Sequence, residues 1–483
     1  MRSSRLTGYL ALAATFAATS TARAQDAAED ADEEESKGDE SKSESKGKEV
    51  AQAAPASDLP EDKLKAMIAA EMGKARVGDV HMHGYFRAGY GFSSEKGRQV
   101  CFQAPGAKAK YRLGNECDLY GEWLFSAPAY VGDNGVVARA NIMFNFYIPT
   151  TTLGYQETLV SQNGRLGKDL HFGYNQFYFN FEKIPFLGEG AGAWIGRRFY
   201  KREDIHITDY FWWNASGPGG GIEDIPISGP IKLSYAAFIL EGNTVGDAPA
   251  PAYPPRFEQG LRNDLRVYGI PLHPGGQLVL GLNAIFDLSD TDLNNDATNN
   301  GFSGTAMYVL DGIMGGNNKV GAQYGVGAAV NANGVVGSLN TSTDTSFIQV
   351  IDNFFIQPTP EIGLQANLIY NHEDVDGGVK TDWISAGGRI SYAFNDNAQL
   401  LAELGYDTEK VENQDRRNLT KITIAPVISA GKGYWARPQL RLFATFGLWN
   451  AAARAAGVDS GGVYTMTTKT SGATFGMQSE SWW

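Results

Sequence analysis

Two cysteines in this sequence could form either a metal site or a disulfide. The segment 101–117 reads CFQAPGAKAKYRLGNEC, and Cys101 and Cys117 are the only cysteines among 483 residues. A structural metal site usually takes four ligands, and no histidine lies between these two thiols. A disulfide is the other chemistry open to the pair, and the compartment of the protein decides whether it forms.

The N-terminus indicates that compartment. The chain opens MRSSRLTGYLALAATFAATSTARAQD, in which two arginines precede an apolar stretch over residues 9–18. The tripeptide Ala-Arg-Ala at 22–24 fits a cleavage site, so residues 1–24 are predicted to be a secretory signal peptide. Export to an oxidising space favours a disulfide between Cys101 and Cys117, whose loop closure would contribute about 3 kcal/mol.

Other candidate sites have weaker patterns. The segment DLSDTDLNND (287–296) has oxygen ligands for a structural Ca²⁺, but it lacks the order and the glycine of an EF-hand, and a solvated loop is the competing interpretation. His81 and His83 could share a strand face, yet no third metal ligand is evident. Since there is also no phosphate loop, nucleophile elbow or basic patch, we expect no enzyme, no other cofactor and no nucleic-acid partner.

Two N-terminal segments differ from the rest of the chain. Residues 25–59 include ESKGDESKSESKGKE and contain no aromatic residue, which is typical of an acidic disordered linker. Residues 60–76 are predicted to form a short amphipathic helix, with one apolar face made of Leu64, Met67, Ile68 and Met72. This helix either packs against identical helices in an oligomer or is a marginal helix on a tether.

From Val77 onward the apolar residues alternate with a period of two. In QLRLFATFGLW, residues 440, 442, 444, 446 and 448 are apolar, and Arg441, Phe443, Thr445, Gly447 and Trp449 alternate with them. After the signal peptide, no stretch of about 18 apolar residues offers a transmembrane helix. Alternating strands that are half polar could instead belong to a soluble sandwich or to a transmembrane barrel.

Three features favour the barrel. The apolar faces are rimmed by Tyr, Trp and Phe, as in an interfacial aromatic girdle. Long connections rich in glycine and asparagine (287–306, 326–345) contrast with tight turns such as HPGG, and the chain ends in SESWW. At roughly 22 residues per strand and connection, residues 77–483 predict an all-β antiparallel transmembrane barrel of about 16 to 18 strands.

Four long motifs show a family resemblance. HGYFRAGYGF (83–92), the cysteine segment (101–117), GRRFYKREDIHITDYFWWNASGPGGGIEDI (196–225) and ARPQLRLFATFGLWN (436–450) resemble maltoporin and its relatives, the carbohydrate-specific porins. The resemblance implies an 18-stranded homotrimeric barrel in the outer membrane of Gram-negative bacteria, through which sugars diffuse. The N-terminal extension is similar to that of sucrose porin, although shorter.

A sugar pore needs two kinds of lumen residue. Aromatic rings stack on the apolar faces of a sugar, and charged side chains exchange hydrogen bonds with its hydroxyl groups. Strand parity puts Tyr85 with Arg87, Tyr120 with Glu122, and Trp449 with Arg441 on the lumen face.

The resemblance also assigns roles to individual residues. It implies an aromatic slide and a polar track along the lumen, although a structural girdle or core position is the competing interpretation for any one aromatic residue. The slide residues are Tyr85, Tyr120, Trp383 and Trp449. The polar track comprises Arg87, Arg112, Glu122, Arg202, Asp204 and Asp209.

The sequence departs from the family at the constriction. Phe211 stands where the family has a tyrosine, and Asn214 where maltoporin has an aspartate. Asn317 aligns with an expected slide phenylalanine, and the segment 149–170 offers only Tyr155 as the aromatic residue that a neighbouring subunit would lend. The resemblance implies a channel for maltose, maltodextrin or other oligosaccharides, and these departures lead us to hypothesise that maltodextrin is not the preferred sugar. A general non-selective porin and a barrel enzyme or adhesion platform are the alternatives.

Overall fold

The computed structural model describes residues 77–149, 161–162, 165–166, 171–244, 257–288, 299–330, 337–339, 341–460 and 462–483. The predicted signal peptide, linker and helix (1–24, 25–59 and 60–76) lie outside these residues, as do Tyr155 and most of the segment 287–296.

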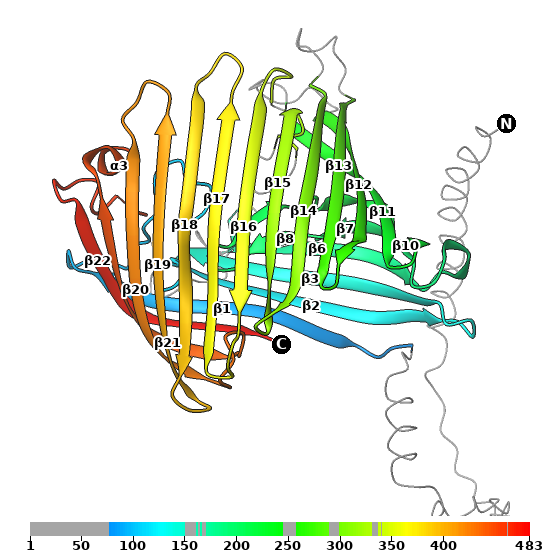
Figure 1. The fold of residues 1–483 in the computed structure, drawn as a ribbon, viewed down its shortest axis with the longest axis horizontal. Coiled ribbons are helices and arrows are strands. Elements are labelled where there is room, and N and C mark those ends of the chain that lie inside the picture. Colours follow the sequence, from blue (N-terminus) through cyan, green and yellow to red (C-terminus); the bar gives the residue numbers. More distant parts are fainter. Residues whose placement is uncertain are drawn as a thin grey trace, which may run out of the picture. The chain divides into compact units, whose positions relative to one another are not determined.

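Eighteen antiparallel strands form one closed sheet, which confirms the predicted fold (Figure 1). Strand β1 pairs with β2 on one side and with the last strand, β22, on the other, so the sheet has no free edge. The barrel strands are β1 (His81–Ser93), β2 (Asp118–Val131), β3 (Val137–Pro149), β6 (His171–Glu182), β7 (Gly192–Arg198), β10 (Gly217–Ser228), β11 (Ile231–Thr244), β12 (Phe257–His273), β13 (Gly276–Asp287), β14 (Gly301–Ile313), β15 (Gly316–Gly327), β16 (Ser346–Ile356), β17 (Ile362–Asp374), β18 (Lys380–Ala393), β19 (Ala398–Val411), β20 (Arg417–Ser429), β21 (Gln439–Trp449) and β22 (Ser471–Trp482).

Six short elements lie in the described parts of the connections. They are the two-residue strands β4 (Ser161–Gln162) and β5 (Arg165–Leu166), the 3-10 helix η2 (Pro185–Leu187), the strands β8 (Glu203–Ile205) and β9 (Tyr210–Trp213), and helix α3 (Ala451–Ala455). Within the described residues, no helix is long and apolar enough to cross a membrane.

The two faces of the wall differ in polarity, as the alternation predicts. In β21, Leu440 and Leu442 on the outer face are 49 % and 54 % exposed, whereas Arg441 and Thr445 on the inner face are 2 % and 0 % exposed. A protein surrounded by water buries its leucines rather than its arginines. The reversed arrangement suits an outer face in lipid and an inner face along a polar channel.

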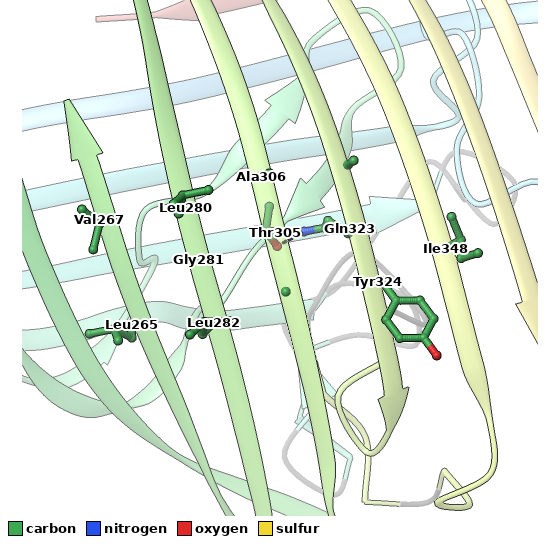
Figure 2. Close-up of a pocket in the computed structure, with 12 residues that line it drawn as sticks. Leu265, Val267, Leu280, Gly281, Leu282, Thr305, Ala306, Gln323, Tyr324 and Ile348 are labelled. Atoms are coloured by element: carbon green, nitrogen blue, oxygen red, sulfur yellow. Dashed lines mark hydrogen bonds between the residues drawn. The ribbon is translucent and has the colours of Figure 1, made fainter. Parts of the chain in front are cut away.

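Figure 2 shows the same arrangement in the wall from β12 to β16. Leu282, Tyr324 and Ile348 line a shallow apolar depression and are exposed on the outer face. Gln323 and Thr305 are buried on the inner face, where the Nε2 of Gln323 donates a hydrogen bond of 3.1 Å to Oγ1 of Thr305. These two polar side chains of the wall thus bond to each other on the lumen side.

The chain terminus completes the closure of the barrel. The backbone N–H of Gly84 donates to the carbonyl of Trp483 at 3.1 Å, and the N–H of Trp483 donates back at 3.2 Å. A Cβ atom at Gly84 would lie 2.3 Å from the Trp483 ring, so this ring packs where only glycine leaves room.

Candidate functional site

A hairpin inside the barrel narrows the lumen. It is formed by β8 and β9, and its two tryptophans pack against the inner wall where strand glycines make room for them. A Cβ atom at Gly321 would lie 2.4 Å from the Trp212 ring, and one at Gly281 would lie 2.2 Å from the Trp213 ring. The hydroxyl of Tyr210, from the same hairpin, donates to the Gln349 side chain in β16.

The segment between the cysteines also folds against the inner wall. Cys101 and Cys117 form a disulfide with their Cα atoms 5.9 Å apart. Beyond the disulfide, Leu113 is held by its backbone: its N–H donates to Glu403 at 3.0 Å, and its carbonyl accepts from Lys421 at 2.8 Å. The wall thus also fixes this segment, hereafter the cysteine loop (101–117), through Glu403 and Lys421, which are far from it in sequence.

Tyr85, Tyr120 and their charged neighbours lie together in the lumen. The two ring centroids are 6.1 Å apart, and Cζ of Arg87 lies 5.0 Å from the Tyr120 centroid. The cysteine loop contributes Arg112, whose Nη2 donates to the Tyr85 hydroxyl at 2.5 Å. The hydroxyl of Tyr120 donates to Glu122 on the same strand. We call these two tyrosines the outer aromatic pair; both rings lie in the lumen, on the inner face of the wall.

The carboxylates around Arg87 balance its charge. Arg87 donates to Asp118 at 2.7 Å through Nε and to Asp209 at 3.3 Å through Nη1. Partial desolvation in the lumen opposes ionisation of Asp209, but Arg112 and Arg87 outweigh it and hold the pKa of this carboxyl below its usual value. The side chain of Asp209 is 43 % exposed, so it remains an ionised group open to the channel.

The predicted constriction residues, Phe211 and Asn214, have different surroundings, and two residues of the predicted polar track lie near them in sequence. Cζ of Arg202 lies 4.4 Å from the centroid of Phe211, so these two side chains stack. Asp204 lines a lumen cavity, and burial together with the charge of Asp209 raises its pKa. Asn214 is buried and its Oδ1 accepts from the N–H of Ser216 at 3.0 Å, which is a turn contact rather than a channel contact.

Trp383 and Trp449 do not join the outer aromatic pair. They are 1 % and 5 % exposed, because loop residues cover them. The Trp383 ring packs 5.5 Å from Tyr210 of the hairpin, and the Trp449 ring packs 5.6 Å from Phe102 of the cysteine loop. Parity correctly places both side chains inside the barrel, and in this structure Tyr210 and Phe102 cover their rings.

A second aromatic group lines the lumen, and sequence reasoning missed it. Trp435 lies 6.4 Å from Trp482 and 5.2 Å from Phe355, centroid to centroid. These three rings face a cavity of about 590 Å³ that is also lined by Asp204 and Asn317. We call the three rings the inner aromatic group.

The sequence carried a signal for only part of this group. Trp482 shares strand parity with Gln478 and Glu480 in QSESWW, so its lumen position could have been found. Trp435 lies in the connection between β20 and β21, where no strand period applies.

Metal ligands do not gather in this lumen. Across the described ranges, no group of three or more His, Cys, Asp or Glu side chains could hold a metal ion. The rings and charged side chains described above offer stacking surfaces and hydrogen-bonding groups.

The closed barrel, apolar outside and polar within, defines a membrane channel of the porin class. The sequence matches the LamB porin family over residues 80–483, and the chain belongs to that family. This confirms the resemblance to maltoporin and its relatives and supports an outer-membrane channel.

Two solved outer-membrane channel structures are similar to this chain at low sequence identity. A BenF-like porin from Pseudomonas fluorescens Pf-5 matches with a TM-score of 0.48 and 10 % identity, covering 84 % of this chain and 100 % of its own. The outer membrane channel DcaP of Acinetobacter baumannii matches with a TM-score of 0.47 and 10 % identity, covering 83 % and 97 %.

Proposed function

We propose that this protein is a sugar channel in the outer membrane of a Gram-negative bacterium, through which oligosaccharides diffuse along aromatic rings and charged groups. The observation that carries the proposal is the outer aromatic pair, where Tyr85 and Tyr120 lie beside Arg87, Arg112 and Glu122. Ring faces suit the apolar faces of a sugar, and paired charges can exchange hydrogen bonds with its hydroxyl groups.

The inner aromatic group supplies a second stacking surface. Transport requires binding that is weak and spread over several sites, so that a sugar can leave as well as enter. Two separate aromatic surfaces in one lumen meet that requirement. A non-enzymatic role follows from this proposal, because the lumen needs only to bind and release.

The inner group also bears on substrate preference. Asn317 lines its cavity, and Lys319 beside it pairs with Glu203 at 2.5 Å. A polar wall at this point would grip a long glucan less well than a continuous row of rings would. This supports the hypothesis that maltodextrin is not the preferred sugar.

A homotrimer in contact with outer-membrane lipid is part of the proposal. Arg197 is exposed on the outer face of β7, opposite Phe177 of β6, which is 61 % exposed. An arginine facing lipid near the bilayer midplane costs about 2–4 kcal/mol. Contact with another copy of the chain at this face would remove that cost.

A planar-bilayer recording with mono-, di- and oligosaccharides tests the function. A sugar channel shows a saturable decrease in ion current as the sugar concentration rises. The second candidate, a general non-selective porin, shows no saturable block. If maltohexaose bound far more tightly than sucrose or glucose, the hypothesis of an altered preference would be wrong.

A further inference from the structure

One buried carboxylate lies between the two aromatic surfaces. Glu480 is on the inner face of β22 and is 1 % exposed. It pairs with arginines from three segments of the chain: Arg112 of the cysteine loop at 3.1 Å, Arg437 of the β20–β21 connection at 2.8 Å, and Arg441 of β21 at 2.5 Å.

Its Oε1 atom is directed to the outer aromatic pair. Oε1 accepts a hydrogen bond from the Tyr85 hydroxyl at 3.1 Å and lies 3.1 Å from Nη2 of Arg112. The same Arg112 nitrogen donates to the Tyr85 hydroxyl at 2.5 Å, so the three groups form a closed triangle. This triangle fixes the Tyr85 ring and the cysteine loop relative to β22.

Its Oε2 atom is directed to the inner aromatic group. Oε2 accepts from Nε and Nη2 of Arg437 at 3.0 and 2.8 Å. Cζ of Arg437 lies 4.0 Å from the Trp482 centroid, so the guanidinium stacks on that ring. Arg437 also donates to the carbonyls of Tyr434 and Ala436, on either side of Trp435, at 3.2 and 2.9 Å.

We propose that Glu480 is a positioning residue that couples the two aromatic surfaces, with one carboxylate oxygen fixing each. This rests on the proposed function, because the coupling matters only if a sugar binds these rings. Glu480 does not face the channel itself. It acts through Tyr85 and Arg112 on one side and through Arg437 on the other.

A simpler role would be charge balance alone, since three buried arginines need a nearby carboxylate. The two roles differ in what a neutral substitution does. Glu480→Gln keeps the side-chain size and one acceptor but loses the charge and the second acceptor. If Glu480 only balances charge, stability falls and sugar affinity of the folded channel stays unchanged.

The test measures the concentration of sugar that half-blocks the current, for folded channels in planar bilayers. With maltohexaose and sucrose as probes, Glu480→Gln should weaken block about tenfold, which corresponds to about 1.4 kcal/mol. Tyr85→Phe, which removes the hydroxyl, should weaken block alone but add little in the Glu480→Gln background, because its hydroxyl acts through Glu480. Glu409→Gln is the matched control, since Glu409 is 2 % exposed and pairs with Arg417 at 2.7 Å.

Each outcome decides between the roles. Unchanged block in Glu480→Gln, or an equal loss in Glu409→Gln, would overturn the coupling while leaving the sugar channel intact. Absence of block in the natural protein would overturn the channel function and the coupling with it. If Glu480→Gln does not fold, Arg437→Gln removes only the link from Oε2 to the inner aromatic group, because Arg441 still bonds to Oε2. This variant should still weaken block, and an unaltered affinity there would refute the proposal.

Discussion

The guanidinium of Arg87 lies 5.0 Å from the centroid of the Tyr120 ring, across the strand pair that joins β1 to β2. The two residues are directly opposite each other in the register of these strands. Arg87 also makes two hydrogen bonds to Asp118, at 2.7 and 2.8 Å, so its plane is fixed by the wall itself. An aromatic ring with a cation held over it combines a stacking surface and a hydrogen-bond donor in one place.

Loss of the disulfide should leave the barrel folded. In the double variant Cys101→Ala/Cys117→Ala, the cysteine loop keeps the backbone bonds of Leu113 to Glu403 and Lys421. We expect a loss of up to about 3 kcal/mol in loop stability, seen as increased open-channel noise. A barrel that no longer resists detergent and mild heating after this change would show that the disulfide supports the whole fold.

Adding one methyl group at Gly321 should displace the hairpin. The Cβ of Gly321→Ala would lie 2.4 Å from the Trp212 ring. Overpacking of this kind costs about 1–3 kcal/mol, so we expect Trp212 to move away from the wall into the lumen and the channel conductance to fall. Gly304→Ala is the control, because its Cβ would meet only Leu282, at 4.0 Å. Equal conductance in both variants would contradict this account of the hairpin.

Acidification should remove the charge of Asp204 before that of Asp209. Burial and the charge of Asp209 raise the pKa of Asp204, whereas the pKa of Asp209 is lowered. A carboxyl with a raised folded pKa protonates first as pH falls, and the cost of burying its charge then disappears, so its contribution favours folding at lower pH. In the window from this raised pKa down to the usual value near 4, cation selectivity should fall.

Reversal potentials in a salt gradient check this assignment. Asp204→Asn should show the lower selectivity already at neutral pH and no acid step in that window. Asp209→Asn should keep an acid step but move it to lower pH, because the charge of Asp209 then no longer raises the pKa of Asp204. An acid step that persists unchanged in Asp204→Asn would assign the titration to another group.

Subunits should meet at the face that carries Arg197. Ile195, two residues before it on the same face of β7, is 70 % exposed. Ile195→Cys should therefore form disulfide-linked copies on oxidation, and Arg197→Glu should weaken the oligomer. Leu404→Cys is the control, because Leu404 is 54 % exposed on the outer face of β19. Crosslinks from Leu404→Cys alone would place the contact on a different face.

The strand alternation predicted the strands and their two faces, because successive side chains of a strand point to opposite sides of the sheet. The aromatic rims, the unequal connections and the aromatic end of the sequence were needed to favour a barrel over a soluble sandwich. The same rule placed Tyr85, Tyr120 and Arg87 correctly on the inner face. It could not separate an open lumen position from one that a loop covers, and so it could not show that Phe102 and Tyr210 bury Trp449 and Trp383.

Contacts between segments that are far apart in the chain could not be predicted from the sequence. Trp435 belongs to a connection without any period, and its ring meets Trp482 only because the barrel closes. The role of Glu480 likewise depends on its ion pair with Arg112, a residue far away in the chain. A local pattern cannot predict which loop residues meet which wall residues, because many loop paths satisfy the same alternation.

The central claim is that sugar binds on the outer aromatic pair. The most direct test is the half-blocking sugar concentration in Tyr120→Ala and Tyr120→Phe channels, measured in planar bilayers beside the natural protein. Loss of a stacking ring is expected to cost about 1.4 kcal/mol or more, so Tyr120→Ala should be blocked at least about tenfold more weakly, and Tyr120→Phe, which keeps the ring, should stay close to the natural channel. Equal block in all three channels, or no saturable block in the natural protein, would contradict the account.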